Sequence, residues 1–223
     1  MANSPGILII GASAAGVSAA REARKAAPDA TVTLVTEEPH LPYHRPILTR
    51  RLADESAEHV RAFTLNPESF YRDERIDLVL SERIESLDMA GHTARASSGK
   101  TYPFDRLILA TGSRPIVPSP GAAGRDNVFA VRTLDDARSA HRCILSARHV
   151  AVIGGGLLGL EAADAVMKTG AKATVIEAAD RLLSLQLDRE SSSIVEATVR
   201  ESGCRIVLGT PAKSIDGPDG HAV

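Results

Sequence analysis

Two glycine-containing turns carry the strongest chemical signal in this sequence of 223 residues. The later turn reads GGGLLG, follows a short apolar run and precedes a helical pattern, as a G-x-G-x-x-G motif should. Gly154 permits a tight turn, Gly156 lets the backbone approach a pyrophosphate, and Gly159 allows close packing of helix against strand. Free N–H groups at the helix start would face the phosphates. The residues predicted to contact a dinucleotide here are Gly154, Gly156, Leu157, Leu158 and Gly159.

An acidic residue completes the later motif. Glu177 lies 23 residues after Gly154, at the end of the next β-branched run. Its carboxylate can accept hydrogen bonds from ribose hydroxyls and would repel a 2′-phosphate, which favours NADH over NADPH. The nearby cation Arg181 keeps NADPH open. A glycine turn with a purely structural role is the alternative.

The earlier turn reads GASAAG and keeps only the first and third glycines. Ser13 at the second position is small enough for close phosphate approach, and Glu37 follows 26 residues after Gly11. Taken alone, the turn is also compatible with an ordinary βαβ connection. Proteins with two dinucleotide folds commonly pass a hydride between two cofactors, and this favours a second nucleotide site. Its predicted contacts are Gly11, Ser13, Ala14, Ala15, Gly16 and Glu37.

The elements around both turns follow one strand–helix–strand pattern. Strands are expected at 7–10, 31–36, 76–80, 83–97 (an antiparallel pair), 107–110, 150–153, 173–176 and 205–208, and helices at 13–27, near 47–53, near 67–74, 157–169 and 188–202. This pattern predicts an α/β fold with two Rossmann-like domains. Prolines and glycines mark residues 114–127 as a linker, so the expected domains are 1–120 and 121–223.

Composition excludes several other classes of protein. A net charge of −2 and 3% aromatic residues give no support for binding nucleic acid or an anionic membrane. No apolar run approaches the ~18 residues of a membrane span, and no secretion signal is recognised, so a cytoplasmic location is expected. The two cysteines, Cys143 and Cys204, form no metal-binding or dithiol motif. No metal site is predicted.

Through essentially its whole length the chain resembles the two-dinucleotide-binding-domain flavoproteins of the glutathione-reductase-like fold. That resemblance implies three-layer domains with FAD at the earlier turn and NAD(P)H at the later one. Thr111 and Gly112, in LILATGS, are similar to the family's A-T-G segment beside FAD. The segment VRTLDDA, residues 131–137, resembles the start of its NAD domain.

The segment PYHRPILTR, residues 42–50, resembles a loop of rubredoxin reductases, ferredoxin reductases of oxygenase systems and NADH–nitrite reductase large subunits. The resemblance implies that Arg45 and Pro46 lie against FAD, and that Arg50 replaces a lysine beside the isoalloxazine. Glu161 matches the glutamate that reaches toward that lysine. Arginine cannot release a proton, so a fixed positive charge remains as its catalytic contribution. A surface arginine and a carboxylate near a helix start are the alternative.

Disulfide and peroxide reductases of this family need a thiol at the flavin, and residues 40–45 read HLPYHR without cysteine. The predicted function is therefore transfer of hydride from NADH to FAD and then of electrons to rubredoxin, ferredoxin or a fused redox centre. The alternatives are a relative of NADH oxidase or coenzyme A disulfide reductase, and a non-catalytic nucleotide-binding module. Family members continue well beyond the equivalent of residue 223, so both domains are expected to be incomplete here and a homodimer is expected only of the full-length protein.

Overall fold

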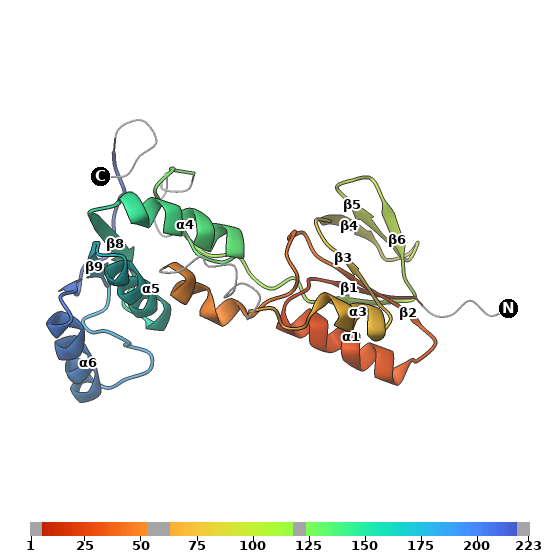
Figure 1. Ribbon diagram of the computed structural model, residues 1–223, viewed down its shortest axis with the longest axis horizontal. Helices are drawn as coiled ribbons and strands as arrows, with labels where there is room; N and C mark the ends of the chain where they lie inside the picture. The colour runs from red at the N-terminus through yellow and green to blue at the C-terminus, as the bar shows by residue number, and fades with distance from the viewer. Residues whose placement is uncertain (1–5, 53–62, 118–123, 218–223) are drawn as a thin grey trace. The chain divides into compact units, whose positions relative to one another are not determined.

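The computed structural model describes residues 6–52, 63–117 and 124–217 of the chain. The chain divides into two compact units, Met1–His44 with Ala57–Ser113 and Arg45–Ser56 with Arg114–Val223. The elements shown in Figure 1 are β1 (Gly6–Ile10), α1 (Ala14–Ala26), β2 (Thr31–Val35), the 3₁₀ helix η1 (Arg45–Leu52), α3 (Glu68–Asp73), β3 (Ile76–Val79), β4 (Ile84–Asp88), β5 (Thr93–Ala96), β6 (Thr101–Pro103), β7 (Arg106–Leu109), α4 (Leu134–Ser146), β8 (His149–Ile153), α5 (Leu157–Lys168), β9 (Lys172–Ile176), α6 (Arg189–Glu201) and β10 (Arg205–Val207).

The first unit has three layers around a parallel sheet of four strands in the order β3-β2-β1-β7. Successive side chains of β1 point to opposite faces, so Ile9 packs toward α1 while Leu8 and Ile10 pack toward the other face. The antiparallel sheet β4-β5-β6 covers that other face through Tyr102 and Phe104. A parallel sheet buried on both faces explains the continuous apolar runs of β1 and β2.

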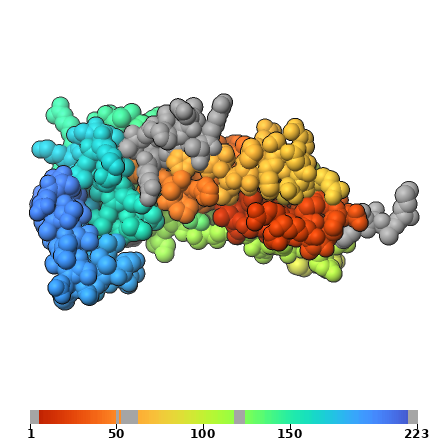
Figure 2. Space-filling view, turned by 60° about the horizontal axis from the view of Figure 1, so that its bottom comes forward, coloured from red at the N-terminus to blue at the C-terminus, as the bar shows by residue number. Residues whose placement is uncertain are grey.

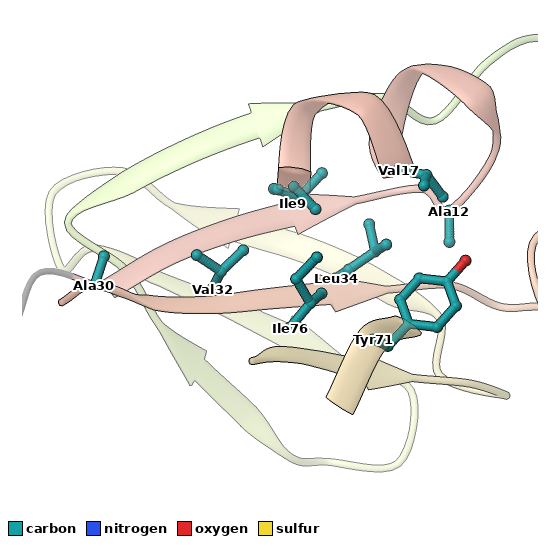
Figure 3. Close-up of a cluster of buried hydrophobic side chains, with 9 residues drawn as sticks. Ile9, Ala12, Val17, Ala30, Val32, Leu34, Tyr71 and Ile76 are labelled. Atoms are coloured by element: carbon teal, nitrogen blue, oxygen red, sulfur yellow. The ribbon is translucent and has the colours of Figure 1, made fainter. Parts of the chain in front are cut away.

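The helix-side core of the first unit surrounds the end of β1 (Figure 3). Ile9, Val32 and Leu34 from the sheet meet Val17 of α1 and Tyr71 of α3. Tyr71 is buried, and its hydroxyl makes no hydrogen bond of acceptable geometry within the described residues. Burial raises the pKa of Tyr71 to about 12, and the side-chain amide of Asn66 only partly offsets this.

Arg24 connects α1 to the segments that precede β2 and β3, at the other end of the helix layer. Its side chain is buried near the C-terminal end of α1, and its guanidinium donates to backbone carbonyls before β2 and before β3. Those carbonyls belong to Pro28, Ala30, Glu74 and Arg75. One charged group therefore satisfies four backbone acceptors where three elements meet.

The second unit repeats the strand–helix–strand plan in a parallel sheet of order β10-β9-β8. Helix α5 packs on β8 and β9, and α6 leads into β10. Leu182 is completely buried after β9, and the hydroxyl of the buried Ser192 on α6 donates to its carbonyl. The α/β class with two Rossmann-like arrangements is thus confirmed.

Two elements were absent from the sequence expectations. Helix α4 begins with a capping box, in which Thr133 accepts from the Asp136 N–H and Asp136 accepts from the Thr133 N–H. Strand β6 pairs with β5 and completes the small antiparallel sheet. None of the helices within 6–52, 63–117 and 124–217 has the length and apolar character that crossing a membrane requires.

The second compact unit contains Arg45–Ser56 as well as Arg114–Val223. Helix η1 precedes α3 in the sequence, but it packs on α4 and α5 of the second unit. Leu48 and Leu52 are both buried and provide the apolar reason for this placement. The second unit is consequently built from two separate stretches of the chain.

Candidate functional site

The earlier turn, between β1 and α1, accepts only glycine at its first and third glycine positions. Gly11 has φ +103°, and a Cβ there would lie 2.2 Å from the Ala110 carbonyl oxygen. A Cβ on Gly16 would lie 1.8 Å from the Gly11 carbonyl oxygen. The Gly11 N–H also donates to the Val35 carbonyl. The turn is thus pressed against the ends of the neighbouring strands, β2 and β7.

The later turn, between β8 and α5, has the same construction. Gly154 has φ +109° and donates its N–H to the Ile176 carbonyl, as Gly11 does to Val35. A Cβ on Gly159 would lie 1.9 Å from the Gly154 carbonyl oxygen. Around Gly156, as around Gly154, no described atom beyond the adjoining residues lies within 4 Å of a Cβ position. This open face is where a pyrophosphate would fit against the backbone.

The helices that follow these two turns also differ from α4 and α6 at their starts. Helices α4 and α6 have acidic residues in the first turn and side-chain caps, from Thr133 and Asp188 respectively. Helices α1 and α5 have no acidic residue in the first turn, and neither Ser13 nor Gly156 caps with a side chain. The first N–H groups of α1 and α5 therefore suit an anion such as a phosphate.

Glu177 follows β9 directly, and the backbone holds its carboxylate in place. One carboxylate oxygen accepts from the Gly155 N–H and the other accepts from the Ala179 N–H at 2.6 Å. A Cβ on Gly155 would lie 2.6 Å from a methyl carbon of Leu182 and 3.0 Å from the Cβ of Glu177. The carboxylate is thus fixed beside the glycine turn, where a ribose would pass.

Arg181 is engaged within its own loop. Its guanidinium donates to the carbonyls of Ser184 and Leu187 and pairs with Asp180 at 3.0 Å. Asp180 pairs with Arg189 as well, and hydrogen bonding to Arg189 lowers the pKa of Asp180. The Arg181 guanidinium is a poor partner for a 2′-phosphate, because its N–H groups already donate to carbonyls and a carboxylate of its own loop.

Glu37 and Glu177, the acidic residues associated with the two turns, do not occupy equivalent positions at the ends of their strands. The Thr36 N–H donates to the Val79 carbonyl just as the Glu177 N–H donates to the Val207 carbonyl. Thr36 therefore corresponds to Glu177, and Glu37 stands one residue later. Glu37 is exposed and forms an ion pair with Arg83. The neighbouring Glu38 accepts a hydrogen bond from the Tyr43 hydroxyl.

The segment after β7 lies against the earlier turn. A Cβ on Gly11 would be 2.6 Å from the Ala110 carbonyl carbon and 3.0 Å from the Thr111 nitrogen. Gly112 has φ +70°, a left-handed conformation that glycine adopts without strain. Thr111 and Gly112 are both exposed. The structure therefore brings the A-T-G segment to the first glycine turn.

Helix η1 brings a further group of candidate residues into the second unit. Arg45 donates to the Arg132 carbonyl at 3.0 Å, and Pro46 is exposed. The side chain of Arg50 lies outside the described part of the structure. The Thr49 hydroxyl donates to the carboxylate of Glu161 on α5 at 2.6 Å. Sequence reasoning missed Thr49, and its position next to Arg50 was the only signal that could have found it.

The two cysteines occupy separate structural positions. Cys204 is buried at the start of β10, and burial raises the pKa of its thiol. Cys143 is half-buried on α4. Within the described ranges, no three histidine, cysteine or acidic side chains are grouped so as to hold a metal ion.

A family model described as pyridine nucleotide-disulphide oxidoreductase matches residues 5–223. The chain is 34% identical over 216 residues to a rubredoxin-NAD(+) reductase of Pseudomonas putida, covering 96% of this chain and 56% of that protein. It thus spans about half the length of the curated relatives it matches.

Solved structures show the same relation. The ferredoxin reductase of the CYP199A2 system from Rhodopseudomonas palustris is 31% identical with a TM-score of 0.88, over 98% of this chain and 54% of that one. The reductase in a covalent putidaredoxin reductase–putidaredoxin complex is 29% identical with a TM-score of 0.83, over 96% and 52%. The resemblance inferred from the sequence motifs is confirmed.

Proposed function

Because this chain belongs to the pyridine nucleotide-disulphide oxidoreductase family, we propose that it forms the two nucleotide sites of an NADH-dependent flavoprotein reductase. FAD belongs at the turn between β1 and α1, and NADH at the turn between β8 and α5. When bound, FAD takes two electrons as a hydride from NADH and can release them singly to an acceptor. The protein residues bind, orient and electrostatically tune these cofactors.

The observation that carries the proposal is the equivalence of the two glycine turns. In each, the third glycine packs on the carbonyl of the first, and the first donates to the end of the next strand. Each turn also leads into a helix with no first-turn acid and no side-chain cap. Two equivalent anion-binding turns in one chain are what transfer between two dinucleotides requires.

At the later turn, Gly156 leaves room for the pyrophosphate, and Leu157 and Leu158 supply exposed apolar surface at the start of α5. Glu177 would accept hydrogen bonds from the adenosine ribose. We infer a preference for NADH, because a phosphate would meet the Glu177 charge while Arg181 is directed at its own loop. The supporting evidence is the pair of hydrogen bonds from the Gly155 and Ala179 N–H groups, which fixes the Glu177 carboxylate in place.

At the earlier turn, Ser13, Ala14 and Ala15 would line the FAD pyrophosphate with the two glycines, and Thr111 with Gly112 would lie beside it. Glu37 remains the proposed ribose acid, one residue beyond the position equivalent to Glu177. Arg45 and Pro46 are proposed FAD contacts from η1. Arg50 and Glu161 are the proposed charged pair near the reacting atoms, where a fixed cation favours negative charge on the reduced cofactor.

The proposed electron acceptor is a small redox protein or a fused redox centre. The support is similarity to proteins whose names specify rubredoxin, ferredoxin and putidaredoxin. A thiol-dependent reaction is disfavoured because residues 40–45 contain no cysteine. We further infer a cytoplasmic location, and for the full-length protein a homodimer.

The visible spectrum of the protein after FAD addition tests the proposal. Addition of NADH without oxygen should bleach the flavin band. A G156D variant should lose this response, because the new carboxylate would occupy the open face and repel the pyrophosphate. A197D places the same charge on an exposed position of α6 and should bleach normally.

Three outcomes would contradict the proposal. Wild-type protein that binds FAD but is not bleached by NADH would show that the two sites are not coupled. Protein without flavin absorbance on FAD titration would favour a non-catalytic nucleotide-binding module. A stoichiometric reactive cysteine in the reduced protein would instead favour the thiol-dependent relatives.

A further inference from the structure

Helix η1 has an unusual position for a segment that supplies proposed FAD contacts. In the sequence it lies among elements of the first unit, yet it packs on α4 and α5 of the second. Figure 1 shows it as an orange helix beside α5, and in Figure 2 its orange atoms adjoin the teal atoms of that helix. Its attachment to α5 therefore determines where the η1 residues lie within the second unit.

Hydrogen bonds attach η1 at its start, its middle and its end. At its start, Arg45 donates to the carbonyl of Arg132, which precedes α4. At its end, the Nδ1 of the buried His141 on α4 lies 2.8 Å from the Leu52 carbonyl oxygen. These two contacts use backbone carbonyls, so they hold the helix in place without involving a second side chain. The middle contact, from Thr49, is different.

Thr49 joins η1 to a proposed catalytic carboxylate. Its side chain is 7% exposed, and its hydroxyl donates to Glu161 at 2.6 Å. An ionised carboxylate only accepts hydrogen bonds, so the hydroxyl proton must point at Glu161. A charge-assisted bond of this length, from a buried hydroxyl to a half-buried carboxylate, restricts the rotation of the carboxylate.

Glu161 lies near the start of α5, the same helix whose first N–H groups face the later glycine turn. A displaced Glu161 would move a negative charge close to the nucleotide site without changing the turn itself. The expected consequence is a change in the rate of reaction of bound NADH and little change in its affinity, because Thr49 is not part of the nucleotide-binding turn.

We infer that Thr49 is a positioning residue, whose hydroxyl holds the Glu161 carboxylate in the orientation that hydride transfer from bound NADH requires. This inference rests on the proposed function. In the reaction a C–H bond of the dihydronicotinamide breaks and its hydrogen moves with both electrons to the flavin. NADH is oxidised, the flavin is reduced, and no further reactant is consumed.

The test is the rate at which NADH reduces the FAD-loaded protein, measured by stopped flow over a range of NADH concentrations. T49V preserves the shape of the side chain but removes the donor, and should lower the limiting rate by about tenfold or more with little change in apparent NADH affinity. T49S keeps the hydroxyl and should retain most of the wild-type rate. T198V makes the same chemical change on α6, where the hydroxyl bonds to its own helix, and should leave the rate unchanged.

A second measurement separates the contact from catalysis. Unfolding free energies of T49V, E161Q and the double variant form a cycle, and a coupling free energy clearly different from zero would support the contact. T49V with a wild-type limiting rate, or T49S as slow as T49V, would overturn the inference while leaving the proposed function intact. If NADH does not reduce wild-type protein, the proposed function fails and the catalytic role of Thr49 fails with it, while the unfolding cycle still reports whether the contact exists.

Discussion

The carboxylate of Glu177 is held by two backbone N–H groups before any ligand contributes. Binding a ribose therefore requires no ordering of this side chain, which lowers the entropic cost of association. In the proposed nucleotide site, the same bonds keep a negative charge where we expect a 2′-phosphate to lie. Affinity for NADH and discrimination against NADPH should accordingly depend on the same group.

The E177A variant tests this dependence. We expect its apparent affinity for NADH to fall by about tenfold or more, since hydrogen bonds to charged groups contribute about 1.5–3 kcal/mol. The ratio of NADH to NADPH affinity should fall as well. Titration of the protein with each nucleotide, followed by fluorescence, provides the measurement, and E190A in the exposed first turn of α6 is the control. An unchanged ratio would remove Glu177 from coenzyme discrimination.

Tyr71 gives a prediction about alkaline pH. Its folded-state pKa of about 12 lies above the ordinary value of about 10, so the folded protein favours the neutral phenol. This contribution to stability is fully present below pH 10 and is lost as the pH rises toward 12. Y71F should therefore lose less stability than wild type between pH 9 and pH 11, as measured by urea unfolding.

At neutral pH the Y71F substitution should cost little, because the buried hydroxyl forms no hydrogen bond of acceptable geometry within the described residues. Tyr102, whose pKa burial also raises, is present in both proteins and cancels in the comparison. Parallel pH profiles for the two proteins would show that Tyr71 does not govern alkaline unfolding.

Individual residues of the site differed in how far sequence could predict them. The first and third glycines of each turn were predictable because backbone conformation or close packing excludes a side chain there, and Gly11 and Gly154 show positive φ. The register of Thr36 and Glu37 was not predictable, because counting residues does not reveal where β2 ends relative to β3. Thr49 was also beyond reach, since its partner is 112 residues away in the sequence.

At the scale of elements, Arg24 connects α1 to the segments before β2 and β3. Replacing it with methionine keeps much of the apolar stem but removes the donor from the buried Ala30 carbonyl and from the part-buried carbonyls of Glu74 and Arg75. We expect R24M to lower the free energy of unfolding by about 3 kcal/mol, since buried unsatisfied groups cost about 1–3 kcal/mol each and several are affected. Denaturant unfolding measures this change.

The matched control is R21M on the same helix, where the side chain is half exposed and pairs with Glu22. Exposed pairs of this kind contribute little, so its stability should lie within about 0.5 kcal/mol of wild type. Equal effects of R24M and R21M would show that the carbonyl contacts of Arg24 do not stabilise the fold.

Most elements were predictable because their apolar periodicity is strong and their ends carry ordinary signals. Helix α4 was not predicted although Thr133 and Asp136 form a capping box, because residues 131–137 also resemble the start of a domain. Strand β6 is only three residues long, which is too short to show a clear alternating pattern, although it pairs with the adjacent strand β5 in a local hairpin. The attachment of η1 to α4 and α5 depends on the burial of Leu48 and Leu52, which local patterns do not assign to a particular partner.

At the scale of the whole molecule, the two glycine turns should respond separately to the two cofactors. Hydrogen exchange with FAD should slow at residues 11–16 and 111–113, while NAD⁺ should slow exchange at residues 154–159 and 177–179. The reason is that a ligand protects the amides it orders or covers. Protection of the same segments by both ligands would contradict the assignment of one cofactor to each turn.

The discontinuity of the second unit has a consequence for synthesis on the ribosome. Residues of η1 emerge before α3 and β7, yet their packing partners α4 and α5 are translated only after the first unit is complete. During that interval Leu48 and Leu52 lack the surfaces that bury them. The nascent chain therefore passes through a stage with an exposed apolar segment, when a chaperone would have most to bind.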